Sequence, residues 1–87
     1  MKKVNETFTA KQANVTSAAS KIVPEAARDT VMIRNIGSNT VYVGGSNVTS
    51  STGFPINAGE ALTLESTIDV YAITASGTSV VAILEER

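Results

Sequence analysis

Short runs of β-branched and other apolar residues, separated by clusters of Gly, Pro, Asn and Ser, dominate the hydrophobic pattern of the chain. These runs lie at 21–23, 28–36, 40–44, 54–56, 61–65, 68–74 and 79–85. No window holds a convincing apolar period of 3.6 residues, so little helix is expected. Short strands at regular spacing are typical of sandwiches and barrels. The pattern therefore predicts an all-β domain, a small β-sandwich or jelly roll of about six to eight antiparallel strands.

The stretch from Ile33 to Gly45 organises this pattern, because strand-forming residues flank a small polar cluster at 37–39. Small polar residues tolerate the positive φ angles that hairpin turns require. The sequence thus predicts a β-hairpin with its turn at Gly37–Asn39. A second strand pair within 61–74 is expected to pack against it. Pro55 cannot donate a ladder hydrogen bond, which predicts an edge strand or a bulge at 54–56.

The first 20 residues are polar and rich in Thr, Ala, Ser and Asn. After Met1, their large apolar side chains are Val4, Phe8 and Val15. We expect an extended N-terminal arm over 1–20, with one irregular strand near 6–9 or 15–16, and a β-sandwich domain over 21–87. A loosely held terminus without a function is the alternative.

The last two predicted strands are apolar on both faces, whereas a two-layer sandwich covers only one face of each sheet. The predicted core takes one face of strands throughout the domain and consists of Ile33, Val41, Val43, Leu62, Leu64, Val70 and Val80. The opposite face would remain uncovered in a single copy, and it supplies a predicted interface. This interface consists of Tyr42, Tyr71, Ile73, Val81 and Ile83.

The amino-acid composition excludes several classes of protein for this chain. The 87 residues include no Cys and no His, so no disulfide and no Cys/His zinc site can form. A net charge of −1 argues against a nucleic-acid binder, and 43% hydrophobic residues argue against disorder. One domain of this size has a small core, and such domains often rely on oligomerisation.

Residues able to carry chemistry are scarce. Without His or Cys, the usual activated nucleophiles are missing, and the sequence predicts neither an enzyme nor a cofactor. Glu65 and Asp69 could contribute to a calcium site only if a loop brought carbonyl groups near them. Met1-Lys2-Lys3 imitates a signal peptide, but no apolar run follows and no segment is long enough to cross a membrane. We expect a soluble chain made in the cytoplasm.

The order of strands and turns resembles that of very small virion proteins of tailed phages, the capsid decoration (cement) and head-fibre proteins. The resemblance covers residues 21–87. It lies in Val31–Gly45, Val48-Thr49, Gly53-Phe54-Pro55-Ile56, Gly59-Glu60, Leu62-Thr63-Leu64 and Val70-Tyr71-Ala72-Ile73. It implies a small β-sandwich or jelly roll without catalytic residues.

The resemblance and the residue pattern together lead to a functional hypothesis. They predict a non-enzymatic capsid decoration protein on the virion surface, made in the bacterial host cytoplasm, with the major capsid protein as its partner. A homotrimer is expected, because icosahedral lattices offer three-fold positions. The N-terminal arm would become ordered on binding. The alternative is a tail-fibre or baseplate accessory, or a carbohydrate-binding module, that contacts the host surface.

Overall fold

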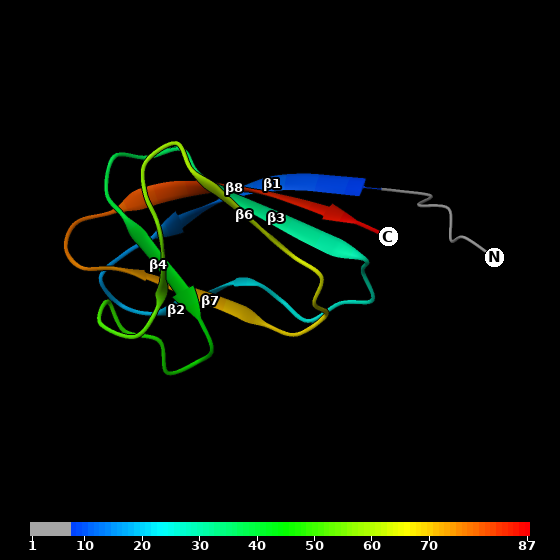
Figure 1. Cartoon of the computed structure of the whole chain (residues 1–87), viewed down its shortest axis with the longest axis horizontal. Helices are drawn as coiled ribbons and strands as arrows, with labels where there is room; N and C mark the ends of the chain where they lie inside the picture. The colour runs from blue at the N-terminus through cyan, green and yellow to red at the C-terminus, as the bar shows by residue number, and fades with distance from the viewer. Residues whose placement is uncertain (1–7) are drawn as a thin grey trace.

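The chain folds as two antiparallel four-stranded sheets that pack face to face (Figure 1). The structure is a computed structural model, described here for residues 8–87. Its strands are β1 (Phe8–Val15), β2 (Ser20–Val23), β3 (Thr30–Asn35), β4 (Val41–Gly44), β5 (Phe54–Ile56), β6 (Ala61–Leu64), β7 (Val70–Thr74) and β8 (Ser79–Glu86). Sheet A has the order β1-β8-β3-β6 and sheet B the order β2-β7-β4-β5. This is the strand order of a jelly roll, so the predicted all-β class is confirmed.

Successive strands mostly lie in different sheets. Only β4 and β5 are both consecutive and paired, and β5 is an edge strand, as Pro55 predicted. The predicted hairpin is wrong, because β3 belongs to sheet A and β4 to sheet B. The turn at 37–39 is an arch that connects the two sheets. The strands of the second predicted pair, β6 and β7, also belong to different sheets. Within residues 8–87, positive φ angles occur only at Gly59 and Gly77, outside this turn.

A buried asparagine explains the arch. The Asn35 side chain is fully buried, and its Nδ2 donates to the carbonyl oxygens of Asn39 at 2.7 Å and Ile56 at 2.9 Å. Its Oδ1 accepts from the Gly37 amide at 3.0 Å and from Ser79 Oγ at 2.8 Å. A residue tied to both sheets leads the chain across the sandwich instead of back along the same sheet.

The N-terminal segment is more ordered than the sequence predicts. Phe8–Val15 forms β1, which pairs with β8 over eight positions from Phe8↔Glu86 to Val15↔Ser79. Residues 8–15 are therefore part of sheet A and not a free arm. Edge strands need few buried side chains, and here Val15 alone is buried while Ala13 is half-buried. The first seven residues of the predicted arm lie outside the described residues.

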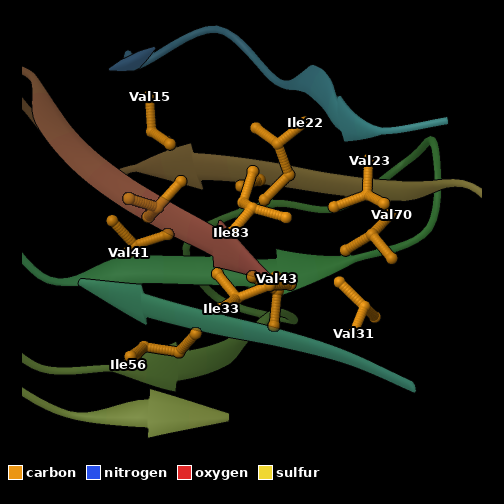
Figure 2. Packing of buried hydrophobic residues seen from close by; sticks show 12 residues of the cluster. Val15, Ile22, Val23, Val31, Ile33, Val41, Val43, Ile56, Val70 and Ile83 are labelled. Carbon is orange, nitrogen blue, oxygen red and sulfur yellow. The ribbon is translucent and has the colours of Figure 1, made fainter. Parts of the chain in front are cut away.

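The core lies between the sheets and consists almost entirely of aliphatic side chains (Figure 2). Ile33, Val41, Val43 and Val70 are buried, as predicted. In β8 the predicted faces are reversed: Val81 and Ile83 are 0% and 2% exposed and point into the core, whereas Val80 is half-buried and faces outward. Figure 2 shows Ile83 inside this cluster. Leu62 and Leu64 pack against the core but are only half-buried.

Candidate functional surfaces

Three of the five predicted interface residues share one surface. Tyr42 on β4 lies opposite Ile73 on β7, and Tyr71 on β7 lies opposite Gly44 and Lys21. Tyr42, Tyr71 and Ile73 are half-buried on the outer face of sheet B. Lys21 Nζ lies 6.0 Å from the Tyr71 ring centre, within the range of a cation–π contact. Val81 and Ile83 belong to the core, so the predicted interface is wrong at these two positions.

A small hollow adjoins Tyr42 on this side of the molecule. It has a volume of about 170 Å³ and is lined by Asn39, Thr40, Tyr42, Ala75 and Ser76. The Asn39 amide is already engaged, because Nδ2 donates to the Thr78 carbonyl oxygen at 2.7 Å. Hydroxyls beside an aromatic ring are suited to a small polar ligand such as a sugar unit.

The outer face of sheet A carries a second apolar surface, which includes Val80 from the predicted core. The outward residues of β8 are Val80, Ala82 and Leu84. Met32 and Ile36 extend this surface and are 42% and 47% exposed. The two-sided apolar pattern of β8 was the signal for an uncovered face, but it did not show which of the two faces is buried.

An apolar groove opens along the edge where β5 and β6 end their sheets. It has a volume of about 490 Å³, and its lining includes Leu62, Leu64, Val43, Val70, Phe54 and Ile68. Phe54 and Ile68 are 59% and 65% exposed at its rim. The half-buried state of the two leucines follows from this opening, because no strand within residues 8–87 pairs with the outer edge of β6.

The buried charges serve structural roles. The Arg28 side chain is fully buried, with Nη1 at 3.4 Å from Glu85 Oε2 and 3.0 Å from the Pro24 carbonyl oxygen. Its Nη2 donates to the Ile68 carbonyl oxygen at 2.7 Å. Arg28 thus connects two loops to β8.

The candidate calcium ligand Asp69 is also engaged. It accepts from the Glu25 amide at 2.6 Å and lies 3.5 Å from Lys21 Nζ. Residues 8–87 contain no group of three or more side chains able to hold a metal ion. The same residues include no helix long and apolar enough to cross a membrane.

The fold is shared with part of a known phage protein. The chain is similar to the crystal structure of the stem and receptor-binding domain of the spike protein P1 from bacteriophage PM2, with a TM-score of 0.69 and 17% sequence identity. The match covers 88% of this chain and 32% of the spike chain, so it spans about a third of that structure. No protein-family model matches the sequence, and no curated protein is significantly similar to it. At this identity the likeness establishes the fold.

Proposed function

We propose that this chain is a non-enzymatic structural protein of a phage virion, exposed on the particle surface and working as an oligomer. The observation that carries the proposal is the jelly roll that 88% of the chain shares with a phage spike protein. The resemblance of residues 21–87 to small phage virion proteins points in the same direction. The absence of His and Cys from the sequence removes the usual catalytic groups and favours an assembly role.

The uncovered surfaces favour an assembly role further. A chain of 87 residues exposes apolar side chains on the outer face of sheet A and in the groove beside β6. Exposed apolar surface of this kind marks sites of contact with other proteins. We assign the major capsid protein as the partner and capsid decoration as the role. The three-fold symmetry expected from icosahedral lattices stays a prediction.

Reconstitution tests the decoration role. Phage heads that lack this protein are mixed with the purified chain, and the pellet and supernatant are compared after sedimentation. We expect saturable binding, a regular added density on the heads in cryo-electron microscopy, and greater resistance of the heads to heat. Heads that remain bare at saturating protein would rule out decoration.

Host-surface recognition is the second candidate. The related structure includes a receptor-binding domain, and the outer face of sheet B carries Tyr42 and Tyr71 beside a polar hollow. Binding to host envelopes or to a glycan array, lost in Tyr42→Ala and retained in Phe54→Ala, would favour this role. Phe54 is a suitable control because it is an exposed aromatic residue at the rim of the groove beside β6, outside the lining of the hollow.

A further inference from the structure

We infer that the outer face of sheet A is a self-complementary surface on which a second copy of this chain packs face to face, related by a two-fold axis. This inference gives the free chain a two-fold partner in solution, distinct from the homotrimer that the sequence predicts on the capsid lattice, and it rests on the proposed function only for its biological setting. Three features of this face are complementary to a second copy: the order of its side chains, a hollow at its centre and the placement of its charges.

The register of sheet A arranges the outward side chains in rows across the strands. One row contains Ala10, Leu84, Met32 and Thr63, and the next contains Gln12, Ala82, Arg34 and Ala61. The first row presents the large apolar side chains Leu84 and Met32. The second row has alanine on β8, where the first has leucine. Neighbouring rows on one face are about 7 Å apart, since each strand residue advances the chain by about 3.4 Å.

A hollow of about 400 Å³ lies at the centre of this face. Ala10, Gln12, Met32, Arg34, Ala82 and Leu84 are among its lining residues. The short side chain of Ala82 on the central strand β8 leaves space between longer neighbours on β1 and β3. An aliphatic side chain from a facing surface could fill this space, as side chains interdigitate where two sheets pack.

The charges of the face are separated along the strands. Arg34 lies in the Ala82 row, and within residues 8–87 its side chain makes no hydrogen bond or ion pair. Glu86 lies two rows away, opposite Phe8 and Thr30, and its Oε1 accepts from Thr30 Oγ1 at 3.0 Å. The face is therefore basic on one side of the Leu84 row and acidic on the other.

A two-fold axis that runs across the strands, between the Leu84 and Ala82 rows, would both fill the hollow and bring the opposite charges together. Rotation about this axis places Leu84 of each copy over Ala82 of the other, so that each hollow receives a leucine. The same rotation places Arg34 of each copy over the Leu84 row of its partner. Glu86 of the partner lies in the next row, within the reach of an arginine side chain. An isologous contact of this kind closes at two copies.

A charge-swap experiment tests the inference with the full chain in the absence of capsids. The molar mass of the wild type is measured by sedimentation equilibrium over a range of concentrations, and dimers are expected. Arg34→Glu and Glu86→Arg each place like charges opposite each other, so each variant alone should be monomeric. Mixed in equal amounts, the two variants should form a heterodimer, because every pair between them is then of opposite sign. The double variant should again form a homodimer.

The controls separate this surface from the others. Lys21→Glu reverses a charge on the outer face of sheet B and should leave the dimer intact. Ala82→Leu fills the hollow without touching the core and should weaken self-association at least tenfold while the β-type circular dichroism spectrum persists. A wild type that is monomeric or trimeric, or single charge reversals that dimerise normally, would overturn the inference. Binding to phage heads is measured separately, so failure of the dimer and failure of the decoration role remain distinguishable.

Discussion

Asn35 and Ser79, 44 positions apart in the sequence, are joined by a hydrogen bond of 2.8 Å in the buried space at one end of the sandwich. Ser79 Oγ donates to Asn35 Oδ1, and Asn35 Nδ2 donates to the carbonyl oxygens of Asn39 and Ile56. This network connects β3, β8, the arch and β5 with every polar atom of the asparagine side chain satisfied. A satisfied buried network of this kind specifies one arrangement of the strands, because each alternative would leave polar groups unpaired.

Replacement of Asn35 should therefore be costly. Asn35→Ala leaves the Ser79 hydroxyl and the Ile56 carbonyl group without their buried partner, and each such loss costs about 1–3 kcal/mol. We expect the free energy of unfolding, measured by urea denaturation, to fall by at least about 2 kcal/mol. Asn47→Ala, in the exposed β4–β5 loop, is the control and should change it by less than about 0.5 kcal/mol. Equal effects at the two positions would contradict the proposed role of the network.

Gly37 lies against the same network. A Cβ atom at this position would clash with Ser79 Oγ and would lie 2.8 Å from the Val80 amide nitrogen. Gly37→Ala should therefore destabilise the domain by about 1–3 kcal/mol, because the arch must move away from β8. Gly45→Ala is a matched control, since its nearest contact would be Asn47 Oδ1 at 3.8 Å. Thermal unfolding of the two variants should show a lower midpoint only for Gly37→Ala.

The sequence located strands β2 to β8 because each contains β-branched, aliphatic or aromatic residues and lies between turn residues. It did not show which strands pair. The cluster at 37–39 suits a hairpin as well as an arch, and the choice depends on contacts of Asn35 with residues more than 20 positions away. The fold class thus follows from local pattern, whereas sheet membership follows from tertiary hydrogen bonds.

The sequence pattern was also insufficient to predict which side chains form the outer surfaces. In β8, Val80, Ala82 and Leu84 are as apolar as Val81 and Ile83, so alternation cannot show which set faces the core. The register with β1 and β3 decides it. Tyr42, Tyr71 and Ile73 were placed correctly on one outer face, because their strands β4 and β7 are paired and have small or β-branched residues on the inner side.

Adjacent valines in β8 test this assignment directly. Val81→Ala removes two methyl groups from a fully buried site and should lower the free energy of unfolding by about 2 kcal/mol. Val80→Ala alters the half-buried outer face and should cost less than about 1 kcal/mol. Urea denaturation of both variants at the same protein concentration provides the comparison. A larger effect at Val80 would restore the face assignment that the sequence alone suggested.

The buried ion pair should behave asymmetrically. Glu85→Ala leaves the fully buried Arg28 guanidinium without its carboxylate and should cost about 3–5 kcal/mol, because the charge remains away from water. The double variant Arg28→Met/Glu85→Leu removes both charges and should recover part of that loss. A double-mutant cycle by urea denaturation measures the coupling between the two sites. Additive effects would show that the pair contributes no specific interaction.

The N-terminal strand β1 should be required for the stability of the isolated chain. An arm that becomes ordered only on the capsid could be deleted with little effect on the isolated fold. Residues 8–15, however, form the edge strand β1 along the whole length of β8, and Val15 is completely buried in the core. Deletion of residues 1–16 would expose the β8 edge and open the core beside Ile83. We expect this truncated chain to lose the cooperative thermal transition of the wild type, or to aggregate through its exposed edge. Differential scanning calorimetry and light scattering measure both outcomes, and an unchanged melting temperature would show that β1 contributes nothing to the stability of the sandwich.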